Sequence, residues 1–294
     1  MRGSGNGSLW NVDIDPPLRR VRTYYEETVE CVEQIYANKT GKLHLLYSGG
    51  QDSEYLFRIF KKLGLDFEVV LILLRGPDSL IYNEHEIKYA FDFCEAYNVT
   101  PIIYNLNFHE FIDSGLNVEI ARSIECCYRS LPGTLHVVSQ IDGFTVLGND
   151  PPYIRYKDDA WYLEETEGIH SILRYYKKHN IPGCPFLLSW SAEMMLSFLI
   201  DPTIMELGSN RLPGKTGSNS SKAHAFNNGS GFEMEPYDFV SKKRIKNTGY
   251  EKIYGSELAN HPNLKIFIED FEKKWNGEYR EKYSDVVERL SIHQ

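Results

Sequence analysis

Residues 42–53 read Lys-Leu-His-Leu-Leu-Tyr-Ser-Gly-Gly-Gln-Asp-Ser, and this stretch decides the fold. Its first half is short, apolar and bounded by glycines, which predicts a buried strand. Apolar residues then recur at helical spacing from Leu56 to Leu63, and Gly64 follows where a C-terminal cap belongs. The pattern predicts a strand, a tight turn and a helix in immediate succession.

The alternation of strands and helices continues on both sides of this turn. An amphipathic helix is expected at 18–36 and further helices at 83–97 and within 115–142, and strands are expected at 67–74, 101–104 and 144–147. Such spacing implies parallel strands joined by right-handed crossovers, in which ligands bind beyond the carboxyl ends of the strands. We therefore predict an α/β fold with a parallel, twisted sheet.

Three parts are expected along the chain. Residues 1–16 are Gly/Ser-rich and predict a flexible terminus, either native or added by cloning. An α/β domain is expected over 17–165. A helical substrate or lid region is expected over 166–294, with helices at 168–179, 187–200 and about 263–289. Within it, 207–231 is rich in Gly, Ser and Asn, which predicts a mobile loop, with a closing lid as the alternative.

The composition limits the partners. The 294 residues are 42% hydrophobic and carry a net charge of −9, so no global basic field is available to hold a nucleic acid. No window of about 18 apolar residues is present to span a membrane. The five cysteines are widely scattered and odd in number, which favours reduced thiols over disulfides or a metal site. We expect a cytoplasmic protein.

The turn between the first strand and the first helix has the composition of an anion site. Two glycines permit close approach of a ligand, and the helix N-terminus offers unpaired amide N–H groups. Ser48 and Ser53 can donate to phosphate oxygens, whereas Asp52 repels phosphate unless Mg²⁺ lies between them. The alternative is a helix cap of the kind found in unrelated sheets.

In this setting, Ser-Gly-Gly-x-Asp-Ser resembles the signature of the PP-loop (N-type) ATP pyrophosphatase superfamily, which has the adenine nucleotide α-hydrolase-like fold. The resemblance implies that the loop binds ATP and Mg²⁺, that AMP and pyrophosphate are released, and that a small-molecule carboxylate or amide is adenylated. It implies catalytic roles for Asp52, Ser53 and Arg129, metal binding by Asp52 and Asp150, and ATP binding by Ser48, Gly49, Gly50, Gln51, Asp52, Ser53, Arg75, Gly148 and Asn149.

Three of these assignments depend on looser matches. Arg75 follows the second strand, where such enzymes receive the adenosine. Residues 128–133 are similar to the Val-Pro-x-Arg region of the 7-cyano-7-deazaguanine synthases, and residues 148–150 to their Gly-x-Asn-x-x-Asp turn. For Arg75 and Arg129 an ordinary surface ion pair is the alternative. For Asn149 and Asp150 the alternative is a plain turn preference.

The chain also departs from the members that it resembles, the deazaguanine synthases and the asparagine synthetases. No cysteine follows Cys184, so the zinc cluster of the former is missing. The cysteine motifs of the thiolases and sulfate-nucleotide reductases are missing too. No glutaminase-like domain precedes the sheet, so nitrogen would come from ammonia, another substrate or a separate donor subunit. A homo-oligomer remains open.

Two other functions remain as alternatives. One is a reductase or sulfur-transfer enzyme of the phosphoadenylyl-sulfate reductase type, which would need a reactive thiol such as Cys126 or Cys127. The other is a nucleotide-binding module without catalysis.

Two basic segments resemble phosphate sites. Residues 208–216 end in Gly-Lys-Thr, but five residues separate the glycines where a Walker A loop requires four. Lys215 could still reach phosphate from a lid. The cations Lys242, Lys243, Arg244 and Lys246 form a compact run, which is either a solvated face or a cover over the pyrophosphate.

Overall fold

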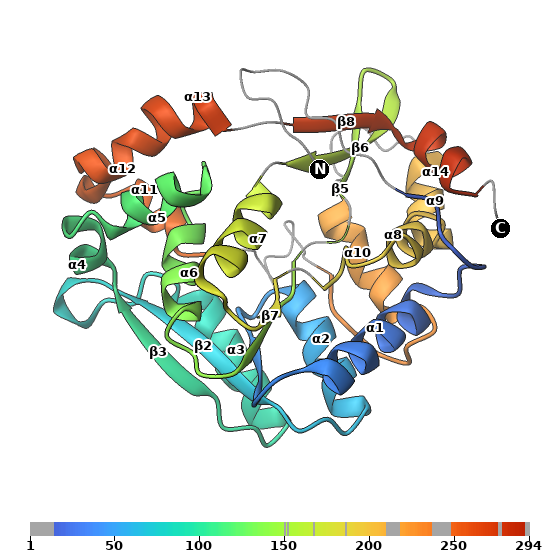
Figure 1. Ribbon diagram of the computed structural model, residues 1–294, viewed down its shortest axis with the longest axis horizontal. Helices are drawn as coiled ribbons and strands as arrows, with labels where there is room; N and C mark the ends of the chain where they lie inside the picture. The colour runs from blue at the N-terminus through green and yellow to red at the C-terminus, as the bar shows by residue number, and fades with distance from the viewer. Residues whose placement is uncertain are drawn as a thin grey trace.

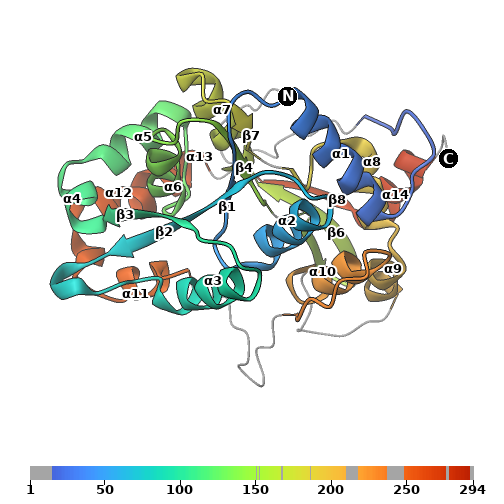
Figure 2. The ribbon, with the colours of Figure 1, turned by 90° about the horizontal axis from the view of Figure 1, so that it is seen from below.

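The computed structural model describes residues 15–149, 151, 153–166, 168–185, 187–209, 218–236, 248–275 and 278–291. Within these ranges the main sheet has five parallel strands in the order β3-β2-β1-β4-β7 (Figure 1 and Figure 2). The strands are β1 (Leu43–Leu46), β2 (Glu68–Arg75), β3 (Ile102–Asn107), β4 (Phe144–Leu147) and β7 (Gly183–Cys184). The parallel α/β sheet expected from the sequence is confirmed.

Strand β1 lies at the centre of the sheet and is buried on both faces. It pairs with β2 on one side and with β4 on the other, which explains why three of its four residues are leucine and why even His44 is buried. The connection after β1 leads to β2, whereas the strand on its other side comes much later in the chain. The strand order therefore reverses between β1 and β4, where open α/β sheets bind their ligands.

Helices cover both faces of the main sheet (Figure 2). Leu45 and Val69 face one apolar cluster, and Leu46 and Val70 face the other. The first cluster contains α1 (Tyr24–Asn38), α2 (Gln51–Lys62) and α3 (Glu84–Ala96). The second contains α4 (Phe108–Asp113), α5 (Leu116–Ile124), α6 (Leu131–Val138), α7 (Gly168–His179), α11 (Tyr250–Tyr254) and α12 (Pro262–Ile266).

A second, antiparallel sheet was not expected from the sequence. It consists of β5 (Tyr153–Lys157), β6 (Ala160–Thr166) and β8 (Glu278–Lys282) in the order β5-β6-β8. No strand was expected at these positions, and β8 lies in the region beyond residue 166 that was expected to be helical, so that expectation is wrong for β8. Their alternating apolar and polar residues have the period of a half-buried strand, which the surrounding helical patterns obscured.

The charged helix expected over 263–289 is also broken into several elements. They are α12, a π-helical turn at Phe267–Phe271, α13 (Glu272–Trp275), β8 and α14 (Tyr283–Ser291). Short 3₁₀ turns occur at Pro77–Ser79 and Glu257–Asn260. Strand β8 separates the C-terminal helices into two groups. Helix α12 packs on α4 and α5, whereas α14 packs on β6 and α8.

The segment expected to be a mobile loop is partly helical. Helices α8 (Ala192–Leu199), α9 (Pro202–Ser209) and α10 (Ser218–Asn227) follow β7, and the last two reach into the range 207–231. Ala223, Ala225 and Phe226 of α10 are buried in the core, although the helix is polar in composition. The loop expectation is therefore corrected for 218–227. Residues 210–217, including Lys215, lie outside the described residues.

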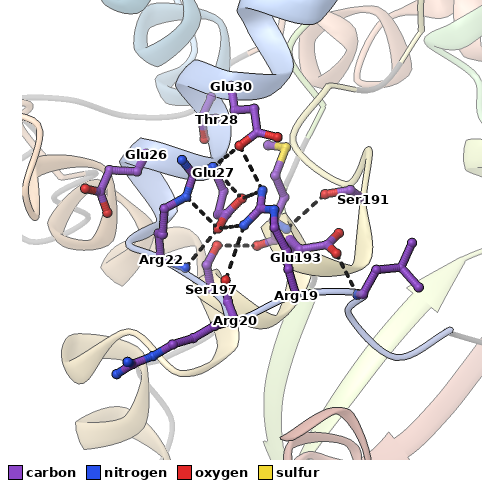
Figure 3. A network of polar contacts seen from close by, with 12 residues as sticks. Arg19, Arg20, Arg22, Glu26, Glu27, Thr28, Glu30, Ser191, Glu193 and Ser197 are labelled. Atoms are coloured by element: carbon purple, nitrogen blue, oxygen red, sulfur yellow. Dashed lines mark hydrogen bonds and ion pairs between the residues drawn. The ribbon is translucent and has the colours of Figure 1, made fainter. Parts of the chain in front are cut away.

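The chain before α1 is fastened to that helix by an ionic network (Figure 3). Arg19 donates to the Glu27 carboxylate at 2.7 Å, and Arg22 donates to it through both its backbone N–H and its guanidinium. Both arginines also contact Glu30. Burial raises the pKa of Glu27, but the hydrogen bonds from Arg19 and Arg22 outweigh this and lower the pKa to about 2. Glu27 is therefore ionised at neutral pH and holds the two arginines against α1.

The division of the chain near residue 165 remains a prediction. Strand β7, at Gly183–Cys184, completes the main sheet from beyond that limit, so the sheet and the later helices interleave along the sequence. In the parts of the chain that the structure describes, no helix combines the length and apolar character needed to cross a membrane.

Candidate functional site

The loop after β1 is folded around two serine hydroxyls. The Ser48 and Ser53 Oγ atoms lie 3.3 Å apart, and the backbone N–H of Gly50 donates to Ser48 Oγ at 3.2 Å. Gly50 is the N-cap of α2 and has no side chain to satisfy the first-turn amides of that helix. The sequence thus places two hydroxyls and a helix N-terminus at one point, which is the arrangement expected of an anion site.

Two glycines are required by the close packing of this loop. Gly49 has a φ of +83°, and a Cβ there would lie 2.6 Å from the backbone oxygen of Glu86. Gly148, in the turn after β4, would place a Cβ 2.8 Å from the backbone nitrogen of Ser53. The turns after β1 and β4 therefore touch at the point where the strand order reverses, as the parallel topology predicts.

Asp52 is held by a lysine from a distant part of the chain. Lys222 Nζ lies 2.7 Å from Asp52 Oδ2. The lysine side chain is 2% exposed, whereas that of Asp52 is 14% exposed and lines a cavity. The buried cation therefore offsets part of the negative charge of the Asp52 carboxylate at the wall of the cavity.

Lys222 was missed by the sequence analysis, and its position follows from the packing of α10. Phe226, four residues later on the same face of the helix, stacks on Tyr55 of α2 with ring centroids 4.3 Å apart and also on Tyr24 of α1. Aromatic pairs contribute about 0.5–1.5 kcal/mol beyond their buried area. The spacing of Lys222 and Phe226 was the available signal, but the polar residues around it suggested a loop.

The loop opens into a cavity of about 680 Å³. Six of the residues expected at the site line this cavity, namely Ser48, Gly50, Asp52, Ser53, Gly148 and Asn149. The floor is apolar and comes from the sheet: Leu46, Val70, Ile72, Leu74 and Leu147. The volume is within the range of roughly 300–1,000 Å³ that small-molecule sites occupy. Phosphate-binding groups at one end and apolar walls beyond them suit a nucleotide.

Four other expected site residues do not line the cavity. Gly49 shapes the loop from behind, and Gln51 donates from its side chain to the backbone oxygen of Glu235 at 2.9 Å. Arg75 donates to Asn105 at 2.8 Å.

Arg129 is the fourth of these residues. It pairs with Glu272 at 2.9 Å and lies over the Tyr254 ring, although its neighbours Tyr128 and Ser130 line the cavity. Asp150 and the cations at 242–246 lie outside the described residues.

The thiols and carboxylates set limits on other chemistry. Cys31, Cys94, Cys126, Cys127 and Cys184 are all free and buried. Burial raises the pKa of Cys126 to about 12, so its thiol stays protonated near neutral pH. Among the described residues, no group of three or more His, Cys, Asp or Glu side chains is gathered to hold a metal ion. A metal bound beside Asp52 would need further ligands from a substrate.

Comparisons with known proteins give weak likenesses. No protein-family model and no curated protein sequence matches the chain. A predicted subunit of tRNA methyltransferase from Methanocaldococcus jannaschii is similar at 15% identity and a TM-score of 0.32, over 54% of this chain and 74% of that one. The U34-tRNA thiolase NcsA from Methanococcus maripaludis, solved with its [4Fe-4S] cluster, is similar at 12% identity and a TM-score of 0.31, over 85% and 78%. Likenesses this weak support no conclusion about substrate or activity.

Proposed function

We propose that this chain is an ATP-using enzyme of the PP-loop type that releases AMP and pyrophosphate while adenylating a small-molecule carboxylate or amide. The observation that carries the proposal is the loop 48–53 at the strand-order reversal, with its hydroxyls and helix N-terminus facing a cavity of about 680 Å³. An oxygen of the acceptor would attack the α-phosphorus, and pyrophosphate would leave. A nucleophile from another substrate, ammonia or a donor subunit would then displace AMP.

The loop residues would bind the β- and γ-phosphates. Ser48 lines the cavity and would donate a hydrogen bond, whereas Ser53 Oγ donates to the Gly50 carbonyl at 3.1 Å and would have to turn from it to donate to a phosphate. The first-turn amides of α2 would supply the remaining donors. Lys222 lowers the repulsion between Asp52 and these phosphates because it lies 2.7 Å from the carboxylate. Catalysis by such groups is mainly positioning and stabilisation of the charge on the leaving pyrophosphate.

The described residues fit a magnesium ion that is shared with the substrate. Mg²⁺ usually binds one or two carboxylates together with substrate phosphates and water, so a protein-only cluster is not required. Asp52 lines the cavity and would provide the carboxylate. When bound, the ion would neutralise charge on the departing pyrophosphate.

The thiol chemistry required by the reductase alternative has no support in the structure. A sulfur-transfer nucleophile must be exposed and ionised, whereas Cys126 is fully buried and its pKa is raised to about 12. We therefore propose adenylation in preference to it. The binding-module alternative makes a different prediction and is distinguished by turnover.

Product analysis tests the proposal. Purified protein is incubated with MgATP and a fractionated metabolite extract, and the nucleotides are separated by chromatography. AMP and pyrophosphate formed by wild type and lost in Asp52→Ala would support it. ADP as the product would contradict the mechanism, and tight ATP binding without turnover in any fraction would favour the binding module.

A further inference from the structure

The small antiparallel sheet has one apolar face and one polar face. Ile154 and Leu163 face each other across β5 and β6 and are buried in the core. Their neighbours along the strands, Tyr153, Arg155 and Glu164, all line the cavity. Since side chains alternate between the two faces of a strand, the polar face of this sheet forms a wall of the site.

This wall carries more cations than carboxylates. Glu164 receives Arg155 Nε at 3.2 Å and Arg280 Nε at 2.7 Å, so two guanidiniums share one carboxylate. Lys282 stands opposite Tyr162 in the register and therefore shares the same face. Tyr153 and Tyr162 lie under the guanidiniums of Arg155 and Arg280 respectively. Glu164 and the rings thus hold the arginines in fixed positions on a positively charged face.

Arg155 is the cation that this wall presents to the cavity. Its side chain is 52% exposed, and among the described residues lining the cavity it is the only Lys or Arg. The phosphate loop reaches the same cavity from the main sheet, on strands that are separate from β5 and β6 (Figure 1). The cavity therefore has two anion-binding features of independent structural origin.

We propose that Arg155 binds an anionic group of the acceptor, separate from the oxygen that attacks ATP. The inference rests on the proposed function, because it assumes that ATP phosphates occupy the loop. The acceptor is then a molecule with at least one carboxylate or phosphate besides its reacting group. A guanidinium binds either anion through paired N–H donors, and such charge-assisted hydrogen bonds favour it over a neutral isostere.

Binding of small anions tests this assignment without requiring turnover. Protein loaded with Mg²⁺ and α,β-methylene-ATP is titrated by calorimetry with succinate, inorganic phosphate or neutral succinamide at constant ionic strength. We expect succinate or phosphate, but not succinamide, to bind wild type. Loss of one charge-assisted contact should weaken that binding about 10- to 100-fold in Arg155→Gln. Arg155→Lys should retain part of it.

The controls separate local binding from general charge. Arg289→Gln removes a cation that pairs with Glu281 of β8 and does not line the cavity, so anion binding should stay unchanged. Equal anion affinity in wild type and Arg155→Gln, or no anion binding by either, would overturn the proposal. So would an equal loss of α,β-methylene-ATP affinity, which would assign Arg155 to the nucleotide. The succinate and phosphate arms distinguish a carboxylate from a phosphate group.

This outcome is independent of the product analysis. If wild type forms no AMP but Arg155→Gln still loses anion binding, the adenylation mechanism fails while the anion site stands. If AMP is formed but Arg155→Gln leaves anion binding unchanged, the adenylation mechanism stands while the anion site fails.

Discussion

Two ion pairs of this protein each contain a buried charge, and they are built in opposite ways. At Glu27 the carboxylate is buried, with 1% of its side chain exposed, and its partner Arg19 is 39% exposed. At Asp52 the lysine partner is buried, and Asp52, with 14% of its side chain exposed, is a residue of the cavity wall. The first arrangement fastens the N-terminal arm to α1. The second places a charge-balanced ion pair at the cavity wall.

The largest difference between the two ion pairs is expected when the charge of each carboxylate is removed in turn. Asp52→Asn should lower AMP formation by about 100-fold or more, since it removes the charge of the carboxylate that we propose to bind Mg²⁺ and leaves Lys222 without its counter-charge. Glu27→Gln is the matched control, because it makes the same chemical change in the other ion pair. Initial rates per folded molecule should be normal in Glu27→Gln. Equal losses in both variants would contradict the distinction.

Glu27→Gln, which should keep normal activity, should nevertheless lose folding stability. Glu27→Gln should reduce the free energy of unfolding at pH 7 by about 3 kcal/mol. This is the free energy that corresponds to the lowering of the Glu27 pKa from 4.5 to about 2. Urea denaturation followed by circular dichroism measures this. A loss well below 1 kcal/mol would mean that the arginines contribute little beyond surface pairing.

The same ion pair predicts a pH dependence. Because the pKa of Glu27 is depressed in the folded state, its contribution is complete above pH about 4.5 and is lost as the pH falls towards 2. The stability gap between wild type and Glu27→Gln should therefore close over that interval. A gap that stays constant from pH 7 to pH 2.5 would show that Glu27 acts by packing alone.

Two glycines with positive φ, one inside the loop and one outside it, provide a matched test of the loop itself. Gly49→Ala places a Cβ 2.6 Å from the backbone oxygen of Glu86, whereas Gly64→Ala meets nothing within 4 Å. Both substitutions carry backbone strain of about 1–2 kcal/mol. Only Gly49→Ala must displace the loop, so its Kd for MgATP should rise about tenfold or more, as misplaced binding groups cause. Equal Kd values in titration calorimetry would count against a phosphate site here.

The smallest effect is expected from the buried thiols. Replacing Cys126 and Cys127 together by alanine should leave the rate of AMP formation within about twofold of wild type, because both thiols are buried. Abolished turnover in a variant that still folds, as judged by circular dichroism, would revive the sulfur-transfer alternative.

The sequence predicted the parts of the site that are contiguous in the chain. Apolar runs and glycines identified β1 to β4, the loop 48–53 and the turn at Gly148, because local periodicity and turn chemistry specify them, but not the two-residue strand β7. It did not predict Lys222, which reaches Asp52 across 170 positions through the packing of Phe226. Arg129 looked suitable by motif, yet it pairs with Glu272. Long-range partners of polar side chains depend on tertiary packing that no local pattern encodes.

The small sheet was missed for a related reason. Its strands are short and half-polar, and β8 comes more than 100 residues after β6, so the pairing that stabilises them is non-local. Arg155, which we propose to bind the acceptor, lies on this sheet. The proposed phosphate site is thus encoded locally, whereas the proposed acceptor site depends on strand pairing in the folded chain.

Hydrogen exchange with and without MgATP tests the central claim most directly, because it compares the two regions in the unmodified protein. The account predicts that saturating MgATP slows exchange of the backbone amides at 48–53 and 148–149, and leaves those of α1 (Tyr24–Asn38), which carries Glu27, unchanged. Unaltered exchange in the loop, or protection that appears only elsewhere, would contradict the assignment of this loop as the ATP site.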